Sequence, residues 1–188
     1  MMSKEKFRKE CLDKLRKRER VNQYKLDKIV VKKLMDLIKE RKCHTIMIYV
    51  PLAIEINVNF LIKKLRKEKK VVLVPFMEGK SFSLVKYRLP LKIKKFGVKE
   101  PSTSNRYKRK IDLAIVPILG TDMTLRRVGF GKGFYDRFFE KSLKNIKEIV
   151  FVGREHCVST EIITQNHDVK GNLYFTPKNS YFTRKLRI

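Results

Sequence analysis

Residues 129–137 hold the densest group of side chains in this chain that could do chemistry. They read Gly-Phe-Gly-Lys-Gly-Phe-Tyr-Asp-Arg and contain three of only eight glycines. Glycine adopts positive φ angles easily and lets a ligand come close to backbone N–H groups. Such groups at the start of a helix, which we expect over residues 134–141, bind anions with the help of the helix dipole. The segment therefore predicts a turn that can bind phosphate groups.

Two side chains within the segment strengthen this interpretation. Lys132 supplies a point charge suited to a phosphate. Asp136 lies in the first turn of the expected helix and could hold Mg²⁺, which favours one or two carboxylates together with substrate phosphates. The spacing matches neither a P-loop nor the Gly-x-Gly-x-x-Gly of dinucleotide folds. From the residues alone, the segment is either a cradle for nucleotide phosphates or a tight turn whose glycines only relieve strain.

The overall charge raises a second possibility. The chain has 188 residues, with 46 Lys and Arg against 19 Asp and Glu, so its net charge is +27. A balance this basic suggests polyanionic partners, nucleic acid first among them. The basic residues are spread along the whole chain, however, so a solvated basic surface is the alternative. The 43% hydrophobic content predicts one globular domain over residues 1–188.

Composition also bears on the compartment. The first eight residues lack an apolar segment, and nowhere does an apolar run approach the ~20 residues that span a bilayer. Cys11, Cys43 and Cys157 are odd in number and far apart, which favours reduced thiols over disulfides or a zinc site. We therefore expect a cytoplasmic protein without membrane association.

Periodicity predicts alternating helices and strands. Helical spacing of apolar residues covers 4–20, 26–38, 58–65 and 134–141, and the second helix should bury Leu26 and Ile29 among others. Apolar runs of strand length occupy 45–50, 71–74, 113–116 and 149–153, with Pro51 and Pro75 ending the first two. Residues 81–87 alternate polar and apolar, as in an antiparallel or edge strand. The pattern predicts an α/β fold, a single three-layer domain with a mainly parallel sheet flanked by helices.

Residues 127–137 resemble the signature of the 5-formyltetrahydrofolate cyclo-ligase (methenyltetrahydrofolate synthetase) family, Arg-Leu-Gly-x-Gly-x-Gly-Tyr-Tyr-Asp-Arg. Further blocks keep the family's order from Lys4 to Asp168: residues 49–56 resemble its Tyr-x-Pro-x-x-x-Glu-Ile pattern, and residues 96–101 its Phe-Gly-Ile-x-Glu-Pro loop. Val128 replaces the usual Leu, and Phe134 the usual first Tyr. The glycine commonly found shortly before the signature arginine is missing.

This resemblance implies ATP- and Mg²⁺-dependent closure of 5-formyltetrahydrofolate to 5,10-methenyltetrahydrofolate, with release of ADP and phosphate after phosphorylation of the formyl oxygen. Arg127 and Lys132 are the implied catalytic residues, and Asp136 and Asp168 the implied Mg²⁺ ligands. The residues implied to bind ATP are Lys4, Arg8, Arg127, Val128, Gly129, Phe130, Gly131, Lys132, Gly133, Phe134 and Tyr135. Those implied to bind the folate are Val50, Glu55, Phe96, Phe130, Gly131, Lys132, Gly133 and Phe134.

The implied partners are small molecules: ATP and 5-formyltetrahydrofolate, with or without a polyglutamate tail. We expect a monomer with no membrane partner and no nucleic-acid partner. A basic nucleic-acid-binding protein remains the alternative function, although the sequence has no recognisable RNA- or DNA-binding motif and no interleaving of aromatic and basic residues for stacking.

Overall fold

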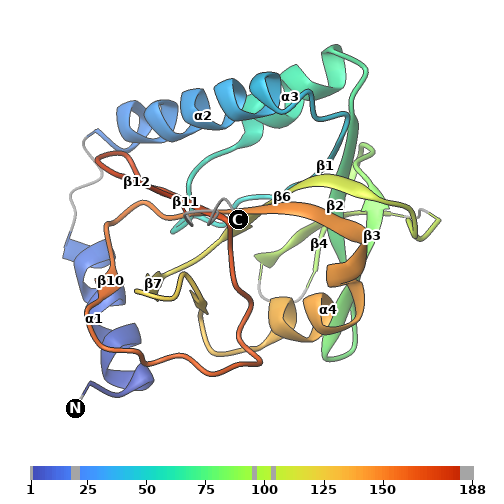
Figure 1. Ribbon diagram of the computed structural model, residues 1–188. Helices are drawn as coiled ribbons and strands as arrows, with labels where there is room; N and C mark the ends of the chain where they lie inside the picture. Colours follow the sequence, from blue (N-terminus) through green and yellow to red (C-terminus); the bar gives the residue numbers. More distant parts are fainter. Residues whose placement is uncertain (1, 18–21, 95–96, 103–104, 183–188) are drawn as a thin grey trace, which may run out of the picture.

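A computed structural model describes residues 2–17, 22–94, 97–102 and 105–182 (Figure 1). Its centre is a seven-stranded sheet in the order β12-β11-β9-β6-β1-β2-β3. The inner strands run parallel; they are β1 (Thr45–Met47), β2 (Val71–Glu78), β6 (Ile111–Pro117), β9 (Ile146–Val152) and β11 (Leu173–Phe175). The edge strands β3 (Ser81–Lys86) and β12 (Ser180–Phe182) are antiparallel to their neighbours. The predicted mainly parallel sheet is confirmed, and so is the edge strand at residues 81–87.

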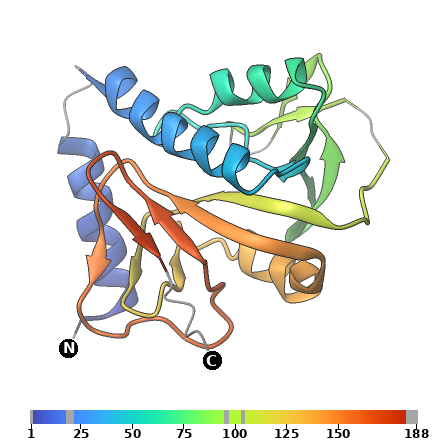
Figure 2. The ribbon, with the colours of Figure 1, turned by 45° about the horizontal axis from the view of Figure 1, so that its top comes forward.

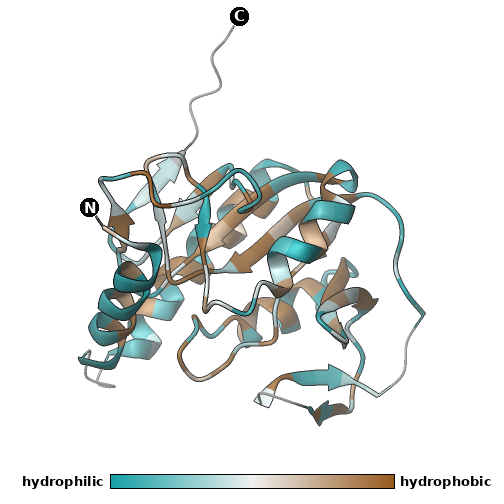
Figure 3. Cartoon of the chain, turned by 90° about the horizontal axis from the view of Figure 1, so that it is seen from below, coloured by the Kyte–Doolittle hydropathy of each residue, from teal (hydrophilic) through white to brown (hydrophobic). Residues whose placement is uncertain are grey.

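Helices cover both faces of this sheet. Helices α2 (Gln23–Glu40) and α3 (Asn59–Lys67) lie on one face, and α4 (Phe134–Ser142) lies on the other (Figure 1). Two separate apolar cores fill the spaces between helices and sheet. Figure 3 shows the central strands largely hydrophobic and the helices with hydrophilic outer sides. Because β6 is covered on both faces, six of its seven residues are buried, as expected for a central parallel strand.

A smaller unit lies beside the main sheet. Helix α1 (Lys4–Lys17) packs against a three-stranded sheet of β10 (Val158–Ser159), β7 (Gly120–Asp122) and β8 (Arg127–Val128), as Figure 2 also shows. Its buried face, Phe7 and Cys11, contacts Leu119, Val128 and Cys157. The remaining strands, β4 (Leu91–Ile93) and β5 (Lys99–Pro101), form a separate pair, and the short 3₁₀-helix η2 (Leu143–Asn145) follows α4.

Two predicted strand ends were wrong. The first strand ends at Met47, before the apolar run does. The second continues through Pro75 to Glu78, and Pro75 pairs with Leu84 of β3. Strand β1 pairs with β2 only as far as Leu73, so Pro75 lies where β2 has a single neighbouring strand and its missing N–H breaks no ladder.

The buried face of α2 also differs from the prediction. Ile29 is 43% exposed and Leu26 only half-buried, whereas Asp27 is buried. Asp27 points toward the interior because its carboxylate forms an ion pair with Arg154, which follows β9. A hydrophobic pattern alone cannot anticipate a buried ion pair. None of the helices in the described ranges is long and apolar enough to cross a bilayer.

Candidate active site

The glycine segment forms a turn between β8 and α4, which we call the glycine turn (residues 129–133). Gly131 has φ 86° and Gly133, the residue that caps α4, has φ 65°. Side chains with a Cβ rarely adopt such angles, which explains both glycines. Gly129 leaves room for the guanidinium of Arg127, which a Cβ at this position would displace.

The glycine turn separates two cavities. The first, which we call the cationic cavity, has a volume of about 700 Å³. The second, which we call the apolar cavity, has a volume of about 340 Å³. Gly129 and Gly131 line the cationic cavity, whereas Phe130 and Lys132 line the apolar cavity. Alternate residues of the turn thus face opposite sides, and Arg127 and Gly133 line both.

The cationic cavity lies between α1, the glycine turn and the start of α4. Its charged lining residues are Lys4, Arg8, Arg126, Arg127, Asp136, Arg137, Glu140, Asp168 and Lys170. The Arg8 Nε donates a hydrogen bond of 3.0 Å to the Gly129 carbonyl. The Lys4 Nζ lies 2.5 and 2.6 Å from the two carboxylate oxygens of Asp168. A spacing of four does place Lys4 and Arg8 on one helical face, toward this cavity.

Arg127 and Asp136 form a second ion pair at this cavity. The Arg127 Nη1 lies 3.3 Å from Asp136 Oδ2, and its guanidinium lies over the Tyr135 ring. Asp136 Oδ1 and Arg127 Nε are buried and have no hydrogen-bond partner among the described residues. Unsatisfied buried polar atoms are costly, so both atoms are suited to a ligand that enters the cavity.

The donor set bears on Mg²⁺. Within residues 2–17, 22–94, 97–102 and 105–182, no three His, Cys, Asp or Glu side chains are close enough to hold a metal ion by themselves. Asp136 and Asp168 nevertheless line the same cavity, and Asp136 Oδ1 is unsatisfied. Asp136 thus offers an open oxygen to an ion that completes its coordination with phosphate oxygens and water, whereas Asp168 would have to share its oxygens with Lys4.

The apolar cavity lies at the carboxyl ends of β1 and β2. Its other uncharged lining residues are Tyr49, Val50, Leu52, Ile54, Pro75, Met77, Phe82, Val98, Phe134 and Tyr135. Glu55 is the only carboxylate among the described residues that line it. Burial raises the pKa of Glu55 to about 7, although the Leu52 N–H and the guanidinium groups of Arg127 and Arg154 lower it. Near neutral pH this carboxyl group can therefore both donate and accept hydrogen bonds.

The structure divides the predicted site residues between the two cavities. Lys132, expected at the phosphates, lines the apolar cavity together with Phe130, Phe134 and Tyr135. Gly131, expected at both substrates, lines the cationic cavity. Val128 lines neither, because its side chain is fully buried against α1. Phe96 lies outside the described residues.

Sequence reasoning also missed residues. Arg137, within the motif itself, holds the turn by donating 2.6 Å hydrogen bonds to the Lys132 and Lys80 carbonyls. Its place directly after Asp136 was the available signal. Arg126 and Lys170 add charge to the cationic cavity, and no pattern in the sequence pointed to Lys170.

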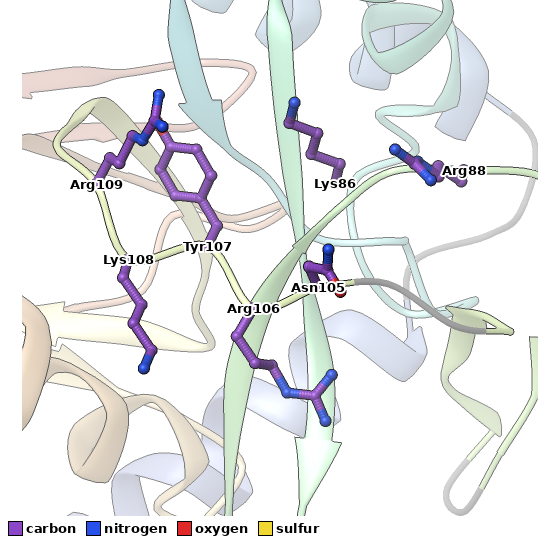
Figure 4. A pocket seen from close by; sticks show the side chains of 7 residues that line it. All are labelled: Lys86, Arg88, Asn105, Arg106, Tyr107, Lys108 and Arg109. Carbon is purple, nitrogen blue, oxygen red and sulfur yellow. The ribbon is translucent and has the colours of Figure 1, made fainter.

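A third hollow has a volume of about 650 Å³ (Figure 4). It is lined by Lys86, Arg88, Asn105, Arg106, Tyr107, Lys108 and Arg109. Lys86 pairs with Leu73 near the start of β2, whereas Phe82 of the apolar cavity pairs with Met77 near its end. These positions are four residues apart, roughly 14 Å along the strand. The hollow is therefore not part of the site around the glycine turn.

Comparison with known proteins gives one consistent result. The 5-formyltetrahydrofolate cyclo-ligase of Haemophilus influenzae is 28% identical over 156 residues, which cover 78% of this chain and 82% of that one. A probable 5-formyltetrahydrofolate cyclo-ligase of Schizosaccharomyces pombe is 28% identical over 121 residues, 60% of this chain and 59% of that one.

Solved structures agree. The NMR structure of Aquifex aeolicus 5,10-methenyltetrahydrofolate synthetase matches with a TM-score of 0.82 and 29% identity, over 100% of this chain and 96% of that one. The Mycoplasma pneumoniae 5,10-methenyltetrahydrofolate synthetase, 20% identical with a TM-score of 0.74, shares the fold over 94% of this chain and 99% of that one. The sequence profile of the 5-formyltetrahydrofolate cyclo-ligase family matches residues 1–177, and this chain, a ligase, belongs to that family.

Proposed function

We propose that this enzyme uses ATP to close 5-formyltetrahydrofolate to 5,10-methenyltetrahydrofolate, releasing ADP and phosphate. One observation carries the proposal: the glycine turn has a cationic cavity on one side and an apolar cavity on the other, and Arg127 lines both. A phosphoryl group bound on the first side can reach an acceptor bound on the second only where the two cavities adjoin.

The cationic cavity is the proposed ATP site. Lys4, Arg8 and Arg127 supply positive charge to a triphosphate, and the turn leads into the N-terminus of α4, which favours anions. Asp136 and Asp168 would hold Mg²⁺, which neutralises phosphate charge when bound. Val128 would contribute only through its backbone.

The apolar cavity is the proposed folate site. Its volume lies at the lower end of typical ligand pockets, which suits the bicyclic pterin part of the substrate better than the whole molecule. Phe130 and Phe134 offer aromatic surface to that ring system, and Val50 adds apolar contact. Glu55, with a pKa of about 7, can accept hydrogen bonds from pterin N–H groups. Phe96 would be a further folate contact, as the resemblance of residues 96–101 to the family's loop implies.

The proposed chemistry follows from the poor leaving ability of the formyl oxygen. That oxygen attacks the terminal phosphorus of ATP, and ADP leaves. N10 of the folate then attacks the activated carbon, loses its proton, and phosphate departs with the former formyl oxygen. Phosphoryl transfer needs positioning and charge stabilisation more than covalent help. Arg127, at the junction, would stabilise the transferring group, and Lys132 would stabilise the negative phosphoryl oxygens once they are attached to the formyl oxygen.

The test is the absorbance of the methenyl product formed from 5-formyltetrahydrofolate, measured with and without ATP and Mg²⁺. Product only in the presence of both is the expected result. Absence of product from a folded sample that binds ATP would point to another acceptor and overturn the proposed reaction.

Nucleic-acid binding remains a second candidate, because of the hollow in Figure 4. Lys86, Arg88, Lys108 and Arg109 have no ion-pair partner among the described residues, and no acidic side chain there lines the hollow. A triple Lys86→Ala, Arg88→Ala, Arg109→Ala variant should bind a labelled single-stranded RNA more weakly. Its affinity should also depend less on salt, because log K falls with log salt concentration at a slope of about −0.7 for each phosphate that the protein neutralises. The control is a triple Lys25→Ala, Lys67→Ala, Lys144→Ala variant. If it weakens RNA binding equally, the binding comes from the overall positive charge and not from the hollow.

A further inference from the structure

One buried ion pair outside both cavities is connected to the proposed folate site. Arg154 follows the end of β9 and is 7% exposed; Asp27 lies on α2 and is 5% exposed. The Arg154 Nε lies 3.1 Å from Asp27 Oδ1, and its Nη2 lies 2.9 Å from Asp27 Oδ2. Such a two-point contact fixes the plane of the guanidinium as well as its position.

Arg154 also donates to the Gln23 side chain of α2 and to the segment that carries Glu55. Its Nη1 donates to the Ala53 carbonyl at 3.2 Å, and its Nη2 donates to the carbonyl of Glu55 itself. Asp27 Oδ2 accepts the Asn57 N–H at 3.0 Å from the other end of the same segment. The ion pair therefore contacts residues 53, 55 and 57, which alternate along the chain.

Apart from the side chains of Ile56 and Val58, which are buried in the main core, polar contacts hold this segment. Residues 51–58 belong to no helix or strand, so no regular backbone ladder holds them. Within the segment, the Leu52 N–H donates to a Glu55 carboxylate oxygen at 2.9 Å, and the Glu55 N–H donates to the Leu52 carbonyl at 3.0 Å. Tyr49 adds one bond, from its hydroxyl to the Ile56 carbonyl at 2.9 Å. The hydrogen bond from Arg154 thus links the Glu55 carbonyl directly to the end of β9, whereas the side chain of Ile56 anchors the next residue in the core.

We infer that Arg154 and Asp27 are positioning residues, which hold the segment 52–57 so that the Glu55 carboxyl faces the apolar cavity. This inference rests on the proposed function in one respect, that the apolar cavity binds the folate. Neither residue touches the proposed reacting atoms. Loss of the pair should therefore impair folate binding while leaving the ATP side of the glycine turn unchanged.

The informative variant is the double substitution Asp27→Leu, Arg154→Met. It removes both charges together, which avoids leaving one of them buried and unpaired, and an apolar pair of similar volume is often tolerated. Arg154→Lys is the conservative variant, since an ammonium can pair with Asp27 but lacks the planar fork. The matched control is Asp112→Leu: its carboxylate also accepts two backbone N–H groups, those of His44 and of Thr45 at the start of β1, at the opposite end of the sheet.

The measurements are KM for 5-formyltetrahydrofolate, KM for ATP, and amide hydrogen exchange over residues 52–57. In the double variant we expect the folate KM to rise by about ten- to a hundredfold, since small misplacements cost that much. The ATP KM should change less than about twofold and exchange in residues 52–57 should become faster. Arg154→Lys alone should raise the folate KM less than the double variant does.

Several results would overturn the inference. A folate KM no higher than that of Asp112→Leu, or a parallel rise in both KM values, would mean that the pair only stabilises the fold. If the unchanged protein forms no methenyl product, the proposed function fails, but hydrogen exchange still decides about the ion pair. Faster exchange confined to residues 52–57 in the double variant would support its positioning role, and exchange equal to that of the control would contradict it.

Discussion

Lys4 Nζ contacts both carboxylate oxygens of Asp168, at 2.5 and 2.6 Å, although the two residues are 164 positions apart in the sequence. The contact fixes the start of α1 against the loop before β11, and the side chain of Asp168 is only 5% exposed. A half-buried pair of this kind does more than a surface salt bridge, because solvent screens it less. It closes one wall of the cationic cavity.

Lys4→Met should raise the KM for ATP by about tenfold, because it removes one charge from the proposed phosphate site and releases Asp168. Turnover at saturating ATP should fall less. Lys6→Met is the control, since Lys6 is exposed on the same helix and lines neither cavity. Steady-state kinetics with ATP as the varied substrate give the KM for ATP of both variants. Equal values for the two variants would exclude Lys4 from ATP binding.

Lys132→Ala should reduce turnover by about a hundred- to a thousandfold, the usual cost of losing a charge-stabilising group. The fold should persist, because the side chain lies at a cavity surface. Circular dichroism and single-turnover rates test this, with Lys141→Ala at the end of α4 as the control. Near-normal turnover would remove Lys132 from the mechanism.

Asp136→Asn should reduce turnover by a similar factor, on the order of a hundredfold or more, and should increase the Mg²⁺ concentration that gives half-maximal rate. The amide cannot offer Mg²⁺ a charged oxygen, and it weakens the partner of Arg127. A magnesium titration at fixed ATP separates the two effects. An unchanged magnesium requirement would argue against Asp136 as a ligand.

Gly131→Ala and Gly79→Ala form a matched pair. Both glycines have positive φ, 86° and 57°, and at either position a Cβ would meet no neighbouring atom closer than 3.9 Å. Each substitution should lower the free energy of unfolding by about 1–2 kcal/mol. Only Gly131 lines the cationic cavity, so only Gly131→Ala should also impair activity. Urea unfolding and turnover measured together test this; equal activity losses would mean that strain alone is responsible.

Glu55 should make stability depend on pH. Burial raises its pKa from its usual 4.5 to about 7, so the folded protein holds the proton more tightly than the unfolded chain does. Its contribution to the free energy of unfolding is therefore fully present below pH 4.5 and is lost as pH rises through about 7. The difference in unfolding free energy between the unchanged protein and Glu55→Gln should shrink or reverse over this range. A constant difference would contradict the raised pKa.

Patterns of apolar residues predicted most of the fold, because burial on both faces of a parallel sheet leaves runs such as 113–116. These patterns gave wrong predictions at two places. Asp27 is buried because it pairs with Arg154, and Pro75 fits within β2 because, among the described strands, only β3 pairs with that part of the strand. The extent of one domain over residues 1–188 stays a prediction.

The site was only partly predictable for a related reason. The motif and its resemblance named the residues of the glycine turn, but only the alternation of its backbone determines which side each residue faces. Lys132 and Gly131 are adjacent in sequence and line different cavities. Contacts between distant segments, such as those of Arg154 with residues 53 and 55, leave no periodic signal in the sequence.

The contact between Lys4 and Asp168 has a consequence for synthesis on the ribosome. Residues 49–135 supply the described lining of the apolar cavity, so those residues emerge together in the middle of translation. The cationic cavity needs α1, made first, and Asp168, which emerges only with the last part of the chain. Because the chain emerges from its N-terminus and a domain folds as a unit, α1 lacks its acidic partner until residue 168 has been made, and the phosphate side of the site is completed last.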